Sequence, residues 1–230
     1  MNDNPSNNEL IWNKIAKSFD KTRNIPWKIC IEFIESFSKN DLVLDIGCGN
    51  GRHLIPCSNN VKKAIGLDIS REFLNIIKNK KMKNNTNIYL IHSNFQFLPF
   101  KNNSIDAALF IASLHNIHNK KNRIMSLIEL NRILKNNGKA LISVWSRWQD
   151  KYRKYFIKNL FINKDTNDFG DIIIHWKKDK FYVPRFYHLY SKREFLDDIK
   201  TSGLKLLKIY DVKLKSKKHI DNYFAIVEKK

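Results

Sequence analysis

An apolar run followed at once by three alternate glycines most constrains the fold of this chain. Val43-Leu44-Asp45-Ile46 predicts a buried strand, and Gly47-Cys48-Gly49-Asn50-Gly51 follows it as a tight turn. Glycine adopts backbone conformations closed to other residues and lets a ligand approach closely. Because α/β sheets bind ligands at the carboxyl ends of their strands, this turn predicts a binding site. Position 52 is Arg, which breaks the G-x-G-x-x-G dinucleotide pattern, and no P-loop Gly-Lys-Ser/Thr follows.

Short apolar runs alternate with helical patterns along most of the chain. Near-continuous hydrophobicity is typical of strands that are buried on both faces of a parallel sheet. The sequence predicts seven strands, at residues 42–46, 64–69, 88–92, 107–111, 140–145, 204–210 and 223–228. The alternation favours an α/β fold built on an open, doubly wound sheet.

Helices are expected between these strands. Apolar residues recur at helical spacing over residues 71–83 and 122–134. Asn136-Asn137-Gly138 is predicted to end the second helix, because Asn and Gly tolerate a left-handed cap. A capping box at Ser191-Lys192-Arg193-Glu194 predicts a further helix toward Thr201.

Residues 146–190 break this rhythm. They are rich in aromatic residues and lysines and show no clear periodicity. Long irregular segments of this kind are often lids or binding loops. We therefore expect one domain over residues 1–230, in which residues 1–30 form a helix on the substrate side and residues 146–190 form an insertion on the same side.

The chain is strongly basic, with 42 Lys plus Arg against 22 Asp plus Glu and a formal charge of +20. With 43% hydrophobic residues it can still bury a core, which excludes a disordered chain. Excess positive charge raises encounter rates with polyanions, so nucleic acid and anionic membranes are candidate partners. The excess of lysine over arginine also fits compositional drift in an AT-rich genome, although drift would supply acidic residues as well.

Signals for export, membrane insertion and metal binding are missing from the sequence. The first residues, MNDNPSNNELIW, carry acids and amides where a secretory signal has basic and apolar segments. No run approaches the ~18 apolar residues of a membrane span. Cys30, Cys48 and Cys57 match no zinc-binding spacing. We expect a cytoplasmic protein with reduced thiols, no membrane association and no metal of its own.

The acid before the glycine turn and a second acid after the next strand resemble the pattern of S-adenosylmethionine-dependent methyltransferases. The resemblance covers roughly residues 42–145 and implies a Rossmann-like, mostly parallel seven-stranded sheet with an antiparallel last strand. It further implies S-adenosylmethionine as cofactor, with Asp45 at the methionine ammonium, Asp68 at the ribose hydroxyls, and a cofactor-binding set of Asp45, Gly47, Gly49, Gly51, Asp68, Ile69, Asn94 and Phe95. Where that family often has an acid for the adenine amine this chain has Asn94, whose carbonyl can accept the same hydrogen bond. Phe95 is equally typical of a core aromatic.

Further segments are similar to the tRNA wobble-uridine (5-carboxymethyluridine) carboxyl methyltransferases. The similar stretches are at residues 12–27, 111–118, 131–145 and 185–190. Together they span nearly the whole chain except residues 151–183. Asn116 and Asn137 replace a His and a Gly of that family's pattern.

This second resemblance implies a reaction and its partners. The family transfers a methyl group from S-adenosylmethionine to the carboxylate of 5-carboxymethyluridine at the tRNA wobble position and forms the methyl ester. It works as a heterodimer with a small zinc-binding activator subunit. A carboxylic acid with a pKa of ~4 is already ionised at neutral pH, so alignment of the reacting atoms can suffice without a general base.

The resemblance also suggests an acceptor pocket. We expect Arg23, His115, Arg185 and Tyr187 to line it, with an arginine clamping the carboxylate in bidentate fashion. Trp27 is expected to stack on the uracil and His188 to bind substrate. Helix packing is an equal alternative for Trp27, and a lone histidine such as His115 is often structural. Basic residues interleaved with aromatics are candidates either for phosphate contacts or for a solvated surface, namely Lys151, Arg153, Lys154, Lys158, Lys177, Lys178 and Lys180.

Two other functions remain open from sequence. A small-molecule methyltransferase would share the same cofactor half, since the fold does not fix the acceptor. A catalytically decayed, RNA-binding protein on a methyltransferase fold is the other alternative, favoured by Asn94 and Asn116.

Overall fold

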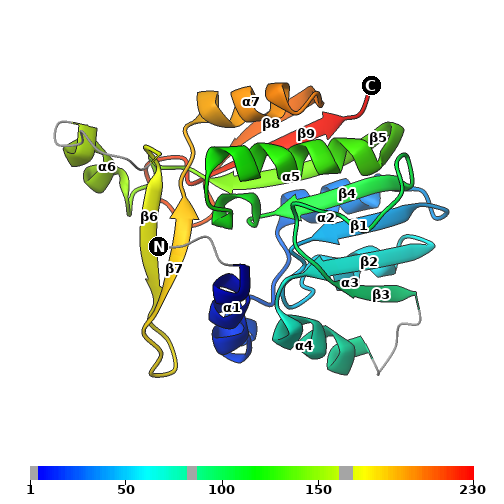
Figure 1. The fold of residues 1–230 in the computed structure, drawn as a ribbon, viewed down its shortest axis with the longest axis horizontal. Helices are drawn as coiled ribbons and strands as arrows, with labels where there is room; N and C mark the ends of the chain where they lie inside the picture. The colour runs from blue at the N-terminus through cyan, green and yellow to red at the C-terminus, as the bar shows by residue number, and fades with distance from the viewer. Residues whose placement is uncertain (1–4, 82–86, 161–167) are drawn as a thin grey trace.

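A seven-stranded sheet forms the centre of the computed structural model, which describes residues 5–81, 87–160 and 168–230. The strand order is β3-β2-β1-β4-β5-β9-β8 (Figure 1). The first five strands in this order are parallel, whereas β9, the last strand of the chain, runs antiparallel to both β5 and β8. The predicted doubly wound sheet with an antiparallel last strand is confirmed. The strand bounds are β1 (Leu42–Ile46), β2 (Lys63–Asp68), β3 (Ile88–His92), β4 (Ile105–Ile111), β5 (Leu134–Trp145), β8 (Lys205–Val212) and β9 (Asn222–Glu228).

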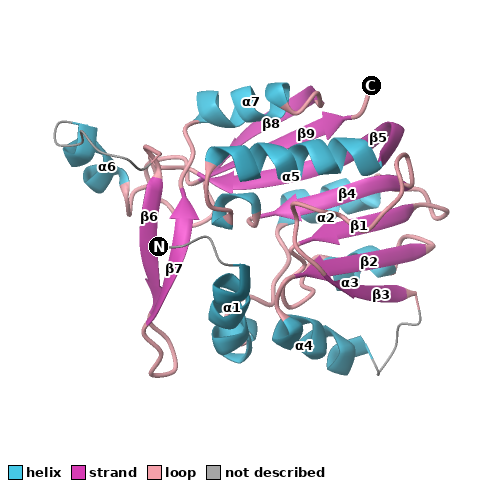
Figure 2. Cartoon of the chain, viewed as in Figure 1, coloured by secondary structure: helices cyan, strands magenta, loops and turns pink. Residues whose placement is uncertain are grey.

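Helices cover both faces of this sheet (Figure 2). One face packs against α2 (Lys28–Glu35), α3 (Leu54–Ser58) and α4 (Arg71–Lys81), and the other packs against α5 (Lys120–Ile133) and α7 (Lys192–Thr201). Side chains along a strand point alternately to the two faces of the sheet. Each inner strand therefore contributes side chains to the hydrophobic cores on both faces and must be apolar at almost every position. No helix in the described ranges is both long and apolar enough to cross a membrane.

The sequence predicts a helix start at Ser191 and a helix stop at residues 136–138, and the structure agrees with only the first. The capping box is confirmed, since Ser191 Oγ accepts the Glu194 N–H and the Glu194 carboxylate accepts the Ser191 N–H. The predicted stop at Asn136-Asn137-Gly138 is wrong, because α5 already ends at Ile133 and β5 begins at Leu134. Asn137 does adopt a positive φ of 63°, but within β5, where its N–H bonds to the Lys229 carbonyl.

The insertion predicted at residues 146–190 has more regular structure than its sequence indicates. It contains α6 (Arg153–Leu160) and an antiparallel hairpin of β6 (Asp171–Trp176) and β7 (Val183–His188) that forms a separate two-stranded sheet. Residues 161–167 lie outside the described part of the chain. In Figure 1 the hairpin stands upright at the left end of the large sheet, beside α1 (Pro5–Asp20). Trp176 of the hairpin donates from its indole nitrogen to Ser18 Oγ of α1 at 2.9 Å, which joins the two.

A buried charge network fixes the other end of the hairpin. His188 is fully buried, and its ring nitrogens lie 2.7 Å from Asp171 Oδ1 and 2.8 Å from Glu194 Oε1. Arg147 pairs with the same Glu194. Burial raises the pKa of Glu194, but the hydrogen bond from His188 and the positive charges nearby outweigh it and leave that pKa below its ordinary value. Expected from sequence to bind substrate, His188 instead holds β7 to α7.

The neighbouring Asp168 does not turn this network into a metal site. Ligand atoms of Asp168, Asp171 and His188 lie within 4.8 Å of one another. However, Asp168 accepts from Arg123 Nη2 at 3.0 Å, and both His188 nitrogens already face carboxylates. The group therefore acts as an internally satisfied ion network.

We expect His188→Ala to destabilise the fold by about 2–4 kcal/mol, since it leaves the Asp171 and Glu194 carboxylates without their shared partner. Urea unfolding at neutral pH measures the loss. The matched control is His175→Ala in the same hairpin, where the half-exposed ring only stacks on Tyr182, and it should cost less than about 1 kcal/mol. Equal losses in the two variants would contradict the structural role of His188.

Candidate active site

A cavity of about 670 Å³ opens at the carboxyl ends of β1, β2 and β4. α1, the β6–β7 hairpin and the turn between β8 and β9 complete its walls, so residues from both ends of the sequence meet there. Its volume falls within the range of small-molecule sites, and its position is where open α/β sheets bind ligands. The N-terminal helix and the insertion therefore both border this cavity.

The glycine turn forms the cavity floor. Gly47 has φ 69°, and a Cβ there would collide with Ser113 Oγ. Gly49 has φ 52°, lines the cavity, and has no heavy atom within 4 Å of the place where a Cβ would lie. Gly51 does not line the cavity but packs against Ile77 of α4, where a Cβ would come within 2.9 Å. Gly49 thus leaves room for a ligand, Gly47 makes room for the Ser113 side chain beside the cavity, and Gly51 serves helix packing.

Asp45 lies directly behind this floor. It is 2% exposed, and its Oδ2 atom has no hydrogen-bond partner among the described residues. Burial raises its pKa to about 7; Asp68 adds to the rise and Arg52 opposes it. A buried carboxylate without a partner is costly unless a cation approaches it. Asp45 is therefore suited to a positively charged ligand group.

Asp68 ends β2 at the cavity wall. Its Oδ2 accepts the Gly49 N–H and its Oδ1 accepts the Ser70 N–H, both at 2.8 Å. Burial raises its pKa to about 6, an effect that these backbone donors oppose. Each oxygen keeps a lone pair for a further donor, such as a hydroxyl group. Ile69 follows it and lines the same wall.

Asn94 and Phe95 lie next along this wall. Asn94 Oδ1 accepts the Gln96 N–H at 3.2 Å, so its carbonyl is already partly engaged. Phe95 packs edge-on against Phe110 at 5.7 Å and lies beneath Gly47. Phe95 therefore serves both interpretations given by sequence, since it borders the cavity and also joins the core.

The opposite side of the cavity is cationic. Arg23 and Arg185 both lie over the Trp176 ring, with guanidinium carbons 5.7 and 5.1 Å from its centroid. Arg185 also donates to Tyr187 Oη. Neither arginine has a carboxylate partner among the described side chains, and burial lowers the pKa of Arg23. A buried and a half-buried guanidinium group, both without a carboxylate partner among the described side chains, form a site for an anion.

His115 lies within a stack of rings beside these arginines. Its ring is 5.4 Å from Tyr187 and 5.3 Å from Trp145, and its Nδ1 accepts the Trp145 N–H at 3.1 Å. That bond places the remaining proton on Nε2, which is buried without a partner among the described residues. Burial, then His188 and Arg185, lower the pKa of His115 to about 3. His115 therefore offers a neutral N–H donor at the cavity.

Arg52 is one of the cavity residues that sequence reasoning missed. Its guanidinium carbon lies 4.2 Å above the Trp27 ring, on a face where a base would stack. The edge of Trp27 packs on Phe224, so helix and sheet packing account for part of its environment. Arg52 has no carboxylate partner among the described residues, and burial lowers its pKa to about 10. Its position directly after the glycine turn was the only signal in the sequence.

The structure thus brings most of the site residues predicted from sequence together around one cavity. Arg23, His115, Arg185 and Tyr187 line the cavity opposite Gly47, Gly49, Asp68, Ile69, Asn94 and Phe95. Asp45 and Gly51 support the floor, Trp27 borders the rim, and His188 lies outside. The residues of the floor fit S-adenosylmethionine, since the orphaned Asp45 oxygen suits an ammonium group, Asp68 suits a ribose diol, and Gly49 opens onto empty space.

Known proteins resemble this chain over part or most of its length. Residues 43–138 match the family model described as a methyltransferase domain. The chain is 34% identical over 159 residues to a tRNA (carboxymethyluridine(34)-5-O)-methyltransferase of Xenopus tropicalis, covering 68% of this chain and 23% of that protein. It is 29% identical over 232 residues to the enzyme of the same description from Schizosaccharomyces pombe, covering 95% and 94%. The chain spans about a fifth of the vertebrate relatives, at 20% to 23% of their length.

Solved structures share the fold. A methyltransferase of Methanosarcina mazei described as S-adenosylmethionine-dependent aligns with a TM-score of 0.73 at 20% identity, over 89% of this chain and 98% of that one. A putative methyltransferase of Haloferax volcanii, solved in complex with the Trm112 methyltransferase activator, aligns with a TM-score of 0.69 at 14% identity, over 98% and 97%. Residues 43–138 therefore match a methyltransferase domain, the chain shares its fold with a structure described as an S-adenosylmethionine-dependent methyltransferase, and its sequence is similar to the tRNA carboxymethyluridine methyltransferases.

Proposed function

We propose that this protein methylates the carboxylate of 5-carboxymethyluridine at the wobble position of a tRNA and forms the methyl ester. The observation that carries the proposal is the cationic side of the cavity. There Arg23 and Arg185, which lack carboxylate partners among the described residues, face a floor suited to the methyl donor. A carboxylate is the anion whose planar geometry matches a guanidinium. The similarity to tRNA carboxymethyluridine methyltransferases supports the choice of acceptor.

The chain's own residues would position the acceptor without removing a proton from it. Arg23 and Arg185 hold the carboxylate, and the neutral His115 donates its Nε2–H to an acceptor oxygen. Because the pKa of His115 is lowered to about 3, it stays uncharged and does not add a further positive charge. Tyr187 orients Arg185 by accepting its hydrogen bond. Alignment in a site shielded from water then accounts for the rate.

The floor would hold the cofactor. S-adenosylmethionine supplies an electrophilic methyl group when bound. Asp45 would neutralise its ammonium, Asp68 would accept hydrogen bonds from its ribose hydroxyls, and Asn94 and Phe95 would border its adenine. The two carboxylates and the two guanidinium groups thus lie on opposite sides of one cavity, which separates the cation-binding from the anion-binding half.

Two partners belong to this proposal. The tRNA would present its wobble base to the cavity, where Arg52, which covers one face of Trp27, offers its planar guanidinium to a base. A small zinc-binding activator subunit would form a heterodimer with the chain, as the family resemblance implies. The Haloferax volcanii complex supports the idea only through its shared fold.

A direct test incubates the protein with labelled S-adenosylmethionine and tRNA from cells that lack wobble-ester formation. The tRNA is then digested and the labelled nucleoside is identified by mass spectrometry. We expect label in the methyl ester of 5-carboxymethyluridine, released by mild alkali. Parallel reactions with a co-expressed activator test that partner. Label in small molecules alone, with none in tRNA, would favour the small-molecule alternative.

We expect Asp45→Asn to separate cofactor binding from stability. The pKa of Asp45 is raised by burial to about 7 in the fold, whereas in the unfolded chain it is ordinary. The folded state therefore binds the extra proton, and stability falls as pH rises from about 4 to 7. At pH 8, without cofactor, the variant should be more stable than the native chain, on the order of 1–3 kcal/mol. Calorimetry should show weaker cofactor binding.

Thermal unfolding at pH 5 is the internal control for this variant. Protonated Asp45 is then neutral in the native chain, so the stability difference should shrink. If Asp45→Asn were less stable than the native chain at pH 8 and bound the cofactor with unchanged affinity, both the expected gain in stability and the role of Asp45 in cofactor binding would be rejected.

Arg23→Ala should lower kcat/KM for the tRNA by about 100-fold, because the substrate carboxylate loses a charged bidentate partner. Arg23→Lys should recover only part of this, since a point charge cannot replace the planar fork. Lys28→Ala is the matched control, because Lys28 lies in the same N-terminal region but outside the cavity. Rates are measured as ester formed under initial-rate conditions. Native-like rates in Arg23→Ala would remove Arg23 from the acceptor pocket.

A further inference from the structure

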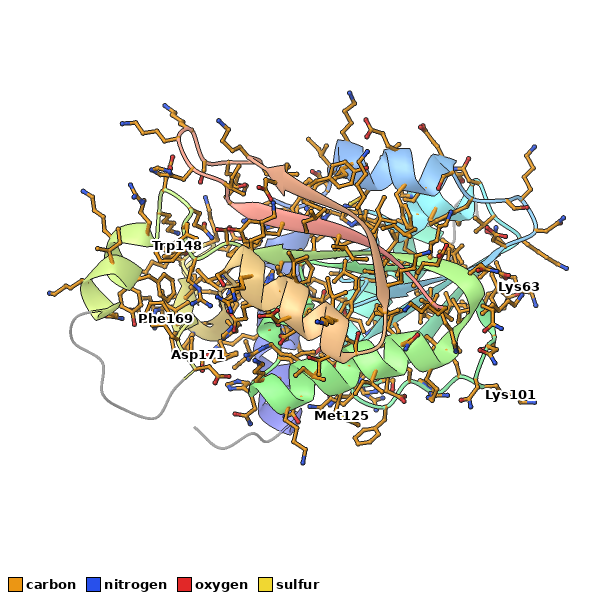
Figure 3. The ribbon with its side chains drawn as sticks, turned by 90° about the horizontal axis from the view of Figure 1, so that it is seen from above. Lys63, Lys101, Met125, Trp148, Phe169 and Asp171 are labelled. Atoms are coloured by element: carbon orange, nitrogen blue, oxygen red, sulfur yellow. The ribbon has the colours of Figure 1, made fainter. Side chains whose placement is uncertain are left out.

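The turn between β8 and β9 carries four lysines at the mouth of the cavity. Its sequence is Lys213-Leu214-Lys215-Ser216-Lys217-Lys218-His219, and residues 214–217 line the cavity. Lys213, Lys215, Lys217 and Lys218 are all exposed, whereas Leu214 and Ser216 are half-buried. Figure 3 shows this turn at the upper left, near Trp148, with nitrogen-tipped side chains directed outward. We call residues 213–219 the lysine turn.

Asp221 fixes the first half of the lysine turn. Its carboxylate accepts the backbone N–H groups of Leu214, Lys215 and Ser216 at 2.8, 2.6 and 2.7 Å. Burial raises the pKa of Asp221, but these donors outweigh it and leave that pKa below its ordinary value. The carboxylate is thereby engaged by the backbone, and the turn keeps one conformation without using its lysine side chains.

Asp150 fixes the second half from the other side of the cavity mouth. Its carboxylate accepts the N–H groups of Lys217, Lys218 and His219 at 2.8, 3.0 and 2.9 Å. Its own N–H donates to Ser216 Oγ at 3.2 Å. Asp150 belongs to the start of the insertion, so the lysine turn is joined to the segment that precedes α6.

The four ammonium groups remain without acidic partners. Within the described residues no ion pair reaches Lys213, Lys215, Lys217 or Lys218, although lysines on the adjacent strand and helix are paired, such as Lys205 with Glu228 and Lys192 with Asp211. Burial and the positive charges of Arg23 and Arg52 lower the pKa of Lys215, so this lysine lies close enough to the cavity arginines to be repelled by them. A fixed backbone that displays several unpaired cations is suited to a polyanion.

We propose that the lysine turn binds the phosphate backbone of the RNA whose base enters the cavity. This inference rests on the proposed function, since it names where that substrate's backbone would lie. The turn borders the same cavity as Arg23 and Arg52, so phosphates flanking an inserted nucleotide would come within reach of its lysines. Contacts of this kind position a nucleic acid and carry no sequence information.

The test compares binding of an unmodified tRNA transcript to the native chain and to the quadruple variant K213Q/K215Q/K217Q/K218Q. At low salt the variant should bind at least about tenfold more weakly. The slope of log affinity against log salt should fall in magnitude by about 2–4, at roughly 0.7–0.9 for each phosphate that the variant no longer neutralises. The matched control K62Q/K63Q/K101Q/K139Q removes the same charge. Of these, Lys63 and Lys101 lie at the end of the molecule opposite Trp148 (Figure 3), and the control should keep most of the slope.

Asp150→Ala separates positioning from net charge. It removes a negative charge, so simple charge counting predicts tighter tRNA binding. If Asp150 orients the lysine turn, binding should instead weaken by about threefold or more. Glutamine substitutions at exposed lysines preserve the fold, which circular dichroism verifies.

The outcomes distinguish this inference from the proposed function. Equal losses in the lysine-turn variant and in the control, or no tRNA binding by the native chain, would overturn the phosphate site. Salt-dependent tRNA binding through the turn, with no ester formed on 5-carboxymethyluridine, would instead leave the phosphate site standing and reject the proposed reaction.

Discussion

The rest of the site depends on the placement of uncompensated charge at the ends of parallel strands. Asp45 and Asp68 end adjacent strands, and their burial raises both pKa values because no cation among the described side chains pairs with them. Across the cavity Arg185 is buried and Arg23 is half-buried, with no carboxylate of the described chain paired with either. Pairing the two sets would stabilise the protein but fill the cavity. Because the two sets are unpaired, each is free to bind a ligand group of opposite sign.

The acceptor half is made from parts that the central sheet does not supply. Arg23 follows α1, and Arg185 and Tyr187 come from the small hairpin. Trp176 joins these pieces, since its ring lies under both arginines and its indole bonds to Ser18. The hairpin is held in turn by the buried His188 network. The cofactor site is therefore supported by the central sheet, whereas the acceptor site is supported by α1 and the hairpin that pack beside that sheet.

Sequence patterns between neighbouring residues predicted a helix or strand correctly where a single kind of local interaction determines that element. The seven strands of the large sheet and the capping box at Ser191 came from hydrophobic runs and a short side-chain motif. The stop at Asn136-Asn137-Gly138 failed because the pairing of β5 overrode the cap preference of those residues. The hairpin was missed because buried and half-buried positions alternate along β7 without an alternation in hydrophobicity, since Arg185 and His188 fill buried positions. The ion network around His188 is likewise not encoded in a local pattern, since its partners come from β6 and α7.

By itself the sequence determined the α/β sheet, the glycine turn and the acids beside it, because each depends on residues that are neighbours along the chain. Only the tertiary structure decided which distant residues meet at the cavity. It brought Arg23 and Arg185 to one ring, left the His115 N–H without a partner among the described residues, and joined Asp150 to the lysine turn. These arrangements depend on how the N-terminal helix, the insertion and the last hairpin dock on the sheet. No local periodicity encodes that docking, since it arises from contacts between residues far apart along the chain, 67 residues for Lys217 with Asp150 and 158 for Trp176 with Ser18.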